Sequence, residues 1–322
     1  MRVLVTGGAG YIGSVICEEL AAAGHAVVVY DNFATGHRDA VIPAARLVEG
    51  DVLDGARLAA TLADERIDAV MHLAAASLVG ESVAQPGKYF RSNVIGGLTM
   101  LEAMRVSDVR VLVFSSSAAV YGAPEKPVIE EDTATAPTNP YGETKLAFER
   151  ALEGYAEAHG LRATSLRYFN AAGATDVNGE RHDPETHLIP LLLQAAAGTR
   201  DEVTVFGDDY PTPDGTCVRD YVHVSDLASA HVLALEALAR RPVGAVYNLG
   251  SGGGYSVRQV IDVAERIVGR AIPVRIGLRR AGDPPRLVAS YARAAAELGW
   301  KPVRQDLGVI VESVWRWMRR AR

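Results

Sequence analysis

The chain has 322 residues, of which 48% are apolar, and a formal charge of −6 at pH 7. This length predicts one larger and one smaller domain, and the acidic balance disfavours a nucleic-acid-binding surface. No apolar run reaches the ~18 residues of a membrane span, and the first residues read as a core strand, not a cleavable signal. Cys17 and Cys217 predict no disulfide framework, so we expect a cytoplasmic protein with Cys17 in its core.

The first segment of the chain is the most informative. A β-branched run from Val3 leads into Gly7, Gly10 and Gly13 and then into a helix-forming stretch. In a dinucleotide-binding turn, the first glycine permits the tight turn, the second lets the backbone approach the phosphates, and the third lets helix and strand pack closely. The free N–H groups at the start of the helix would bind the pyrophosphate.

The second predicted strand, Ala26–Tyr30, ends in Asp31. A carboxylate there accepts hydrogen bonds from both hydroxyls of the adenine ribose and repels a 2′-phosphate, so NAD is favoured over NADP. The glycine spacing, Gly-x-x-Gly-x-x-Gly, resembles that of the extended short-chain dehydrogenase/reductase superfamily. That resemblance places Asp51, which follows the strand-like Arg46–Val48, near the adenine amino group.

Apolar strand-like runs then alternate with helical patterns along the chain. The runs Ala69–Leu73, Val109–Ser115 and Arg162–Tyr168 are separated by helical patterns at Pro86–Arg105 and Tyr141–His159. Strands that alternate with helices of this length predict a parallel sheet with helices on both faces. The expected fold class is therefore α/β, a Rossmann-type doubly wound parallel sheet.

The composition of the sequence changes after Asn170, where polar loops that contain proline and glycine become frequent. Val222–Leu238 and Ala245–Leu249 still read as a helix and a strand of the first domain. We therefore expect an NAD-binding domain of residues 1–169, which also receives about 222–250, and a smaller mixed α/β domain in the rest of 170–322. Polar loops that contain proline and glycine favour substrate contact in this part: Gly173–Glu185, Gly207–Gly215 and Arg279–Pro285.

The candidate chemistry lies in Tyr141-Gly-Glu-Thr-Lys145. A tyrosine and a lysine four residues apart share one face of a helix, so the ammonium can stabilise a phenolate and lower the pKa of the tyrosine. Behind an NAD-binding turn, such a phenolate is a base for oxidising an alcohol. Ser117 ends a predicted strand at the ligand-binding edge of the sheet, and we expect its hydroxyl to bond the reacting oxygen and relay its proton.

Several further segments show that the chain resembles the UDP-glucose 4-epimerases of that superfamily, from residue 1 to about 317. The matching segments are Thr6–Ser14, Val79–Val83, Phe114–Gly122, Pro140–Lys145, Arg167–Ala174, Phe206–His223 and Tyr247–Gly250. The resemblance implies NAD-dependent interconversion of UDP-galactose and UDP-glucose through a 4-keto sugar, with Ser117, Tyr141 and Lys145 as catalytic residues. It also implies a homodimer formed by helices from Pro86–Arg105 and Tyr141–His159.

The resemblance extends to the binding residues. The implied NAD contacts are Gly7, Gly10, Tyr11, Ile12, Gly13, Asp31, Asn32, Asp51, Val52, Leu73, Asn93, Ser115, Tyr141, Lys145 and Tyr168. The implied UDP-sugar contacts are Ser117, Tyr141, Asn170, Leu188, Thr204, Phe206, Arg219, Tyr221, Arg280 and Asp283. Guanidinium groups suit the diphosphate because they bind it with two parallel hydrogen bonds.

Two positions depart from the family pattern. Ser77 stands where several epimerases have a lysine, which predicts weaker NAD retention. Leu287 stands where the family varies between tyrosine and small residues, a position linked to the acceptance of N-acetylated sugars. We therefore expect UDP-glucose and UDP-galactose as the main pair, with some turnover of UDP-N-acetylglucosamine.

The residues of the chain also bear on other possible functions. A 4,6-dehydratase needs an acid and a base after the fifth strand, whereas this chain has Ser117-Ala-Ala-Val there. A 4-epimerase of UDP-glucuronate or of a UDP-pentose stays open, because it differs only in pocket residues. A non-catalytic NAD-sensing protein is disfavoured by the intact catalytic residues. His182 and His187 share a loop without a third ligand at suitable spacing, so no metal site is predicted.

Overall fold

Seven parallel strands form the central sheet of the structure, a computed structural model that describes residues 1–280 and 283–320. Their spatial order is β3-β2-β1-β4-β5-β6-β11. The strands are β1 (Arg2–Thr6), β2 (Ala26–Asp31), β3 (Arg46–Glu49), β4 (Ala69–His72), β5 (Val111–Ser117), β6 (Arg162–Tyr168) and β11 (Val246–Leu249). The order reverses between β1 and β4, which is where open α/β sheets bind ligands. The predicted Rossmann-type class is confirmed.

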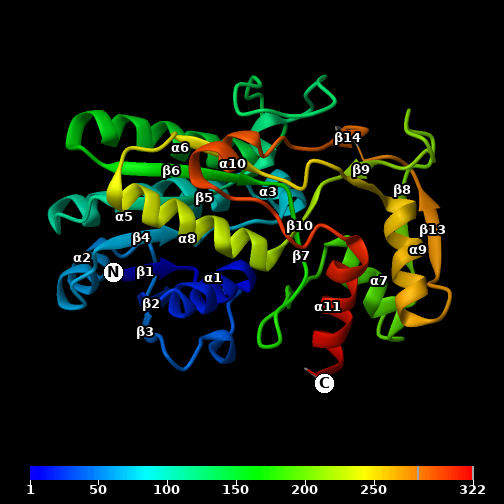
Figure 1. Cartoon of the computed structure of the whole chain (residues 1–322), viewed down its shortest axis with the longest axis horizontal. Helices are drawn as coiled ribbons and strands as arrows, with labels where there is room; N and C mark the ends of the chain where they lie inside the picture. Colours follow the sequence, from blue (N-terminus) through cyan, green and yellow to red (C-terminus); the bar gives the residue numbers. More distant parts are fainter. Residues whose placement is uncertain (281–282, 321–322) are drawn as a thin grey trace.

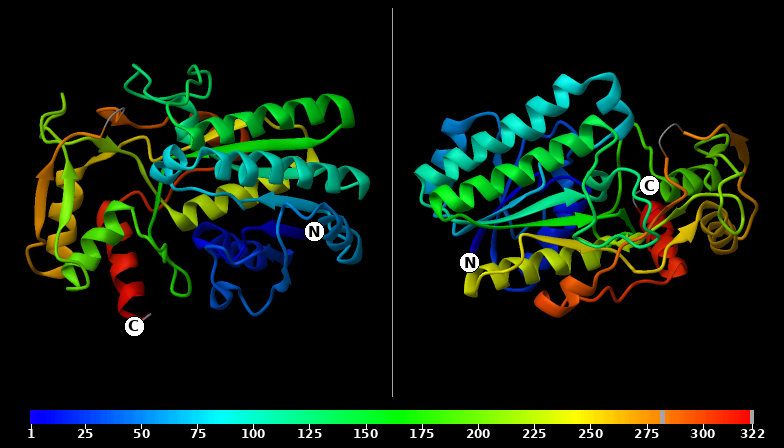
Figure 2. Two further views of the ribbon diagram at one scale, coloured as in Figure 1. Left: turned by 180° about the vertical axis from the view of Figure 1, so that it is seen from behind. Right: turned by 90° about the horizontal axis from the view of Figure 1, so that it is seen from above.

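Helices cover both faces of this sheet (Figures 1 and 2). Alternate residues of a strand point to opposite faces, so Val3 and Val5 of β1 pack with one set of helices while Leu4 packs with the other. Helices α1 (Tyr11–Ala22) and α8 (Val224–Arg240) contribute to the first cluster. The second cluster contains residues of α2 (Gly55–Asp64), α5 (Gly96–Val106) and α6 (Pro140–His159).

A smaller body of structure follows the sheet, beside its carboxyl edge (Figure 1). Its own hydrophobic cluster joins residues of three helices, α7 (Leu188–Ala196), α9 (Val257–Val268) and α11 (Leu307–Arg320). Short strands complete it: β7 (Asn170–Ala172) with β10 (Tyr221–His223), β8 (Val203–Phe206) with β13 (Val274–Gly277), and β9 (Val218–Arg219) between β12 (Tyr255–Ser256) and β14 (Arg286–Leu287). The helix α10 (Ala292–Leu298) returns to the first cluster of the main sheet.

Most predicted elements are confirmed, with small shifts at their ends. The run Val109–Ser115 becomes β5, Val111–Ser117, so the strand includes Ser117 itself. The single helix expected over Pro86–Arg105 is instead three consecutive pieces, which follow the short α3 (Val79–Ala84). They are α4 (Pro86–Tyr89), a π-helical segment η2 (Phe90–Ile95) and α5, while 3-10 turns form η1 (Arg38–Ala40) and η3 (Ala118–Tyr121).

The late part of the chain returns to the main sheet, as predicted. The strand β11 pairs with β6, so it completes the sheet at one side. Cys17 is fully buried in the first cluster, as expected, and both cysteines are free thiols. In residues 1–280 and 283–320, no helix combines the length and apolar character needed to cross a membrane.

Candidate active site

The glycine-rich turn follows β1 at the carboxyl edge of the sheet. Gly7 has a φ of +73°, which residues with side chains rarely adopt, and Gly10 is the N-cap of α1. A Cβ at Gly13 would collide with the carbonyl oxygen of Gly7. The turn is therefore a cradle that glycine alone permits, at a helix N-terminus that favours an anion. Tyr11 and Ile12 begin that helix, and the arrangement fits the pyrophosphate of NAD.

The acidic residues predicted to contact adenosine lie beside this turn. Asp31 ends β2, and its Oδ2 accepts a hydrogen bond from the N–H of Ala9 at 3.0 Å. Asn32 follows, and its Nδ2 donates to Oδ2 of Asp51 at 2.9 Å. Val52, next along the chain, is buried in the second cluster. The structure thus brings these predicted contacts to one end of the sheet, next to the glycines.

Predicted site residues at the ends of the neighbouring strands lie along the same edge of the sheet. Leu73 directly follows β4, and its N–H donates to the carbonyl of Thr6 at the end of β1 at 3.0 Å. Ser117 ends β5 directly opposite Tyr168, which ends β6. Ser115 is two residues earlier on β5, and its hydroxyl lies 2.8 Å from Nε2 of His231. The predicted residues of four strands therefore share one edge.

The three candidate catalytic side chains meet at the start of α6. The first turn is fixed by Asn139, whose Oδ1 accepts a hydrogen bond from the N–H of Gly142 at 3.0 Å. Tyr141 is buried in that turn, close enough to Ser117 for Ser117 to lower the pKa of the Tyr141 hydroxyl. One turn later, Nζ of Lys145 donates to the carbonyl oxygen of Ser115 at 2.8 Å and lies 5.8 Å from the centroid of the Tyr141 ring.

Burial sets the proton affinities of these groups. It raises the pKa of the Tyr141 hydroxyl above its ordinary value, and the nearby Ser117 hydroxyl partly lowers it. Burial also lowers the pKa of Lys145 to about 7, against the attraction of Glu149, which raises it. The sequence suggested that Lys145 would lower the pKa of Tyr141. In the structure, Ser117 is the group that lowers it.

A buried polar network lies behind this triad and was missed by the sequence analysis. Glu149 and Arg167 form an ion pair whose side chains are 4% and 6% exposed. Ser116 donates to Glu149 at 2.5 Å, and Arg167 donates to the hydroxyl of Tyr121 at 2.9 Å. Glu149 is four residues beyond Lys145, so the i, i+4 spacing that identified the lysine could also have identified it.

Asn93 holds two segments of the chain together through its side-chain amide. It lies in η2, where its Oδ1 accepts a hydrogen bond from the N–H of Ala76 at 2.8 Å. Its Nδ2 donates to the carbonyl of Ala76 and to Oγ1 of Thr144, both at 3.0 Å. The amide therefore ties the connection after β4 to α6. Ser77, which follows Ala76, is exposed at the surface of that connection.

The predicted sugar-nucleotide residues gather in the smaller body. Arg219 is paired with Asp283 at 2.7 Å and donates to the carbonyl of Pro284 at 2.9 Å. The guanidinium of Arg280 lies 3.9 Å above the ring of Phe206. Thr204 is on β8, Leu188 is the first residue of α7, and Asn170 begins β7 opposite Tyr221 of β10. Within the loop predicted at 279–285, residues 281 and 282 lie outside the described residues.

Leu287 packs against a buried cluster beside β5. It pairs with Arg219 in the short sheet, and the cluster contains Ala118 and Phe169. Ala118 directly follows Ser117 in the chain. The selective role that the resemblance implies for Leu287 stays a prediction.

The loop histidines depart from the sequence analysis. His182 and His187 were expected to lack a third ligand at suitable distance. The structure places two carboxylates, those of Glu180 and Glu185, beside them, and one ligand atom from each residue lies within 4.8 Å of every other. That expectation was wrong because the fold of the loop, which spacing alone does not reveal, brings the four side chains together.

Comparison with known proteins identifies the family. Residues 3–250 match the model of the NAD dependent epimerase/dehydratase family. The chain belongs to this family. It is 53% identical over 315 residues to a UDP-glucose 4-epimerase of Corynebacterium glutamicum, covering 98% of this chain and 95% of that one.

Solved structures agree with this membership. A UDP-glucose 4-epimerase from Brucella ovis in complex with NAD is 51% identical, with a TM-score of 0.95 over 98% of this chain and 97% of that one. A UDP-glucose 4-epimerase from Bifidobacterium longum in complex with NAD+ and UDP is 39% identical, with a TM-score of 0.94 over 99% and 98% of the two chains. Both similarities extend over nearly the entire chain.

Proposed function

We propose that this protein interconverts UDP-galactose and UDP-glucose as an NAD-dependent 4-epimerase, an isomerase that retains its cofactor. The observation that carries the proposal is the convergence of Ser117, Tyr141 and Lys145 at the sheet edge that also holds the glycine turn. The curated relatives of similar length support the same activity. A cytoplasmic location is part of the proposal and is favoured by the free Cys17 and Cys217.

The chain's own residues move the proton in this reaction. Tyr141, as a phenolate, takes the proton of the sugar 4-hydroxyl, and Ser117 hydrogen-bonds the same oxygen. NAD, when bound, supplies the two-electron acceptor and later the donor. The resulting 4-keto sugar turns about its phosphate linkage and is reduced on its other face, and Tyr141 returns the proton. Lys145 holds the nicotinamide ribose beside Tyr141.

The binding of the two ligands divides between the two parts of the chain. Residues 1–169, with about 222–250, bind NAD, and the rest of 170–322 binds the UDP-sugar. Arg280 stacked on Phe206 provides a guanidinium for the diphosphate. Arg219 takes part by exchanging its pairing with Asp283 for the diphosphate, which costs little because the carboxylate is partly exposed and can be rehydrated.

Paired tyrosine variants test the proposal. Tyr141→Phe removes the base, whereas Tyr155→Phe removes a hydroxyl further along the same helix that bonds the exposed Glu102. With UDP-galactose as substrate and chromatography of the products, we expect wild-type turnover for the control and a loss of about 100-fold or more for Tyr141→Phe. Equal activity of the two variants would remove Tyr141 from the mechanism.

The same assay separates related substrates. Parallel incubations with UDP-N-acetylglucosamine and UDP-glucuronate distinguish the 4-epimerases that the sequence leaves open. We expect UDP-galactose to react fastest. Turnover of UDP-glucuronate alone would preserve the mechanism and overturn the substrate assignment.

We further propose that two copies of the chain associate through η2 and α5. Leu101 and Met104 are buried within the chain's own core, but Phe90, Ile95 and Leu98 remain exposed along this helical edge. An exposed apolar surface of this kind favours a protein partner, and the family resemblance favours a second copy.

A charge on this surface tests the dimer. We expect wild-type protein to have the mass of two chains in light scattering after size exclusion, and Ile95→Glu to have the mass of one. Val303→Glu, which places the same charge on an exposed valine between α10 and α11, is the matched control and should stay dimeric. A wild-type protein with the mass of one chain would refute the association.

A further inference from the structure

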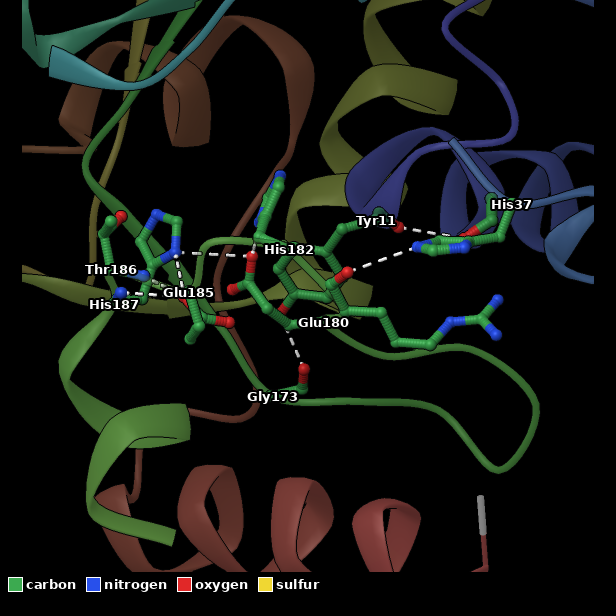
Figure 3. Close-up of polar contacts among 10 residues, drawn as sticks. Tyr11, His37, Gly173, Glu180, His182, Glu185, Thr186 and His187 are labelled. Carbon is green, nitrogen blue, oxygen red and sulfur yellow. Dashed lines mark hydrogen bonds and ion pairs between the residues drawn. The ribbon is translucent and has the colours of Figure 1, made fainter. Parts of the chain in front are cut away.

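The loop between β7 and α7 carries a cluster of four side chains that the proposed reaction does not use. Glu180, His182, Glu185 and His187 turn toward a common point (Figure 3). Nδ1 of His187 lies 2.9 Å from Oε1 of Glu185 and 3.3 Å from Oε1 of Glu180. Nδ1 of His182 contacts the same oxygen of Glu180.

The burial of the two carboxylates favours a compensating positive charge. The side chains of Glu180 and Glu185 are only 3% and 4% exposed. Within residues 1–280 and 283–320, no lysine or arginine forms an ion pair with either of them, and the imidazoles are the facing groups. Buried charges are normally paired or bound to a metal.

We propose that these four side chains bind one divalent metal ion of the zinc class. Two imidazole nitrogens and two carboxylate oxygens form a tetrahedral ligand set that zinc accepts at about 2.0–2.2 Å. Donors around such an ion lie about 3.3 Å apart. The distances from Nδ1 of His187 to the two carboxylates, 3.3 and 2.9 Å, are close to this value, whereas Nδ1 of His182 and Oε1 of Glu180 are closer together. Imidazole ligands disfavour Ca²⁺ and Mg²⁺, which prefer oxygen.

The surrounding backbone orients one of the ligands. The N–H groups of Thr186 and His187 donate to Oε1 of Glu185 at 2.7 and 2.8 Å. Hydrogen bonds of this kind fix the orientation of a ligating carboxylate. Because four protein ligands leave no open position on a tetrahedral ion, the role of the site is structural.

The ion would fasten this loop over the proposed NAD site. The carbonyl of Gly173 accepts a hydrogen bond from the hydroxyl of Tyr11 at 2.6 Å, and Arg181 pairs with Asp39 at 2.8 Å. A small cavity is lined by Gly10 and Tyr11 of the glycine turn and also by His182. The metal site is therefore adjacent to the cradle for the pyrophosphate, and its effect on NAD, unlike metal binding itself, rests on the proposed function.

Metal binding is tested on the full-length protein without a histidine tag. After treatment with a chelator, the protein is titrated with Co²⁺ and followed by visible absorption, and then with Zn²⁺ in competition with a chromophoric chelator. We expect one ion per chain and the intense absorption of tetrahedral Co²⁺. Glu180→Gln and His182→Ala should each weaken binding by more than the roughly 10–100-fold that outer-shell changes cost.

His159→Ala is the matched control, because His159 is an exposed histidine at the end of α6, outside the cluster. It should bind metal as the wild type does. Absence of a one-to-one Co²⁺ complex in the wild type, or equal binding by His182→Ala, would overturn the site. We also expect NAD to dissociate faster from the chelated protein than from the Zn²⁺ form. Equal dissociation with stoichiometric metal would overturn the fastening role alone.

Discussion

Replacing Glu149 with leucine should destabilise the protein strongly. The side chains of Glu149 and Arg167 are almost completely buried, and two hydrogen bonds join them, one of them Nε to Oε1 at 2.9 Å. Removing one partner leaves a buried, unpaired guanidinium, which costs about 3–5 kcal/mol. At roughly 2.1 cal/mol/K of unfolding entropy per residue, the melting temperature falls by about 4–7 °C.

Calorimetry at saturating NAD measures this loss, with two comparison variants. Glu153→Leu changes an exposed glutamate one turn further along α6 and should melt within about 1 °C of wild type. The double variant Glu149→Leu/Arg167→Met removes both charges and should recover much of the stability, because two apolar side chains often replace a buried pair at little cost. If the double variant loses the sum of the two single losses, the argument from an unpaired buried charge is refuted.

Three further predictions concern the cofactor, pH and the substrate. Gly13→Ala should purify without NAD, because the new Cβ meets the carbonyl of Gly7. The control Gly154→Ala lies on an open helix surface, so it should retain NAD and raise the free energy of unfolding by up to about 1 kcal/mol. Equal NAD content in the two variants would contradict a pyrophosphate site at the glycine turn. Burial lowers the pKa of His72 to about 3, so the folded state keeps this imidazole neutral where the unfolded state gains a proton. This group therefore lowers stability by roughly 1.4 kcal/mol per pH unit as pH drops below about 6.5. His223 and His231, whose pKa values burial lowers to about 4, add to the pH dependence, so His72→Asn should reduce the slope in denaturant titrations by about that amount, and an unchanged slope would contradict the assignment. Leu287→Tyr should lower turnover of UDP-N-acetylglucosamine relative to UDP-glucose. An unchanged ratio would show that Leu287 does not control the acceptance of N-acetylated sugars.

The sequence predicted the fold, and the proximity of the candidate catalytic residues, because their signals are local. Gly7, Gly13 and Asp31 are placed by one strand, one turn and one helix, and Tyr141 and Lys145 by a single helical turn. Strand order then follows from the right-handed crossovers of parallel strands.

The remaining features depend on contacts between distant segments. The pairing of Arg219 with Asp283 joins residues 64 positions apart, and no spacing rule predicts it. The π-helical turn before α5 places the amide of Asn93 on Thr144, 51 positions away. The four-residue cluster at Glu180–His187 depends on how its loop folds back, which local propensity does not fix.

One labelling experiment tests the proposed mechanism most directly. UDP-galactose that carries deuterium at C4 is converted by the purified protein in ordinary water, with no NAD added, and the UDP-glucose formed is analysed by mass spectrometry. Oxidation and reduction at C4 within one closed site predict product that keeps its deuterium. Loss of the deuterium to water would contradict the mechanism built on Tyr141 and retained NAD.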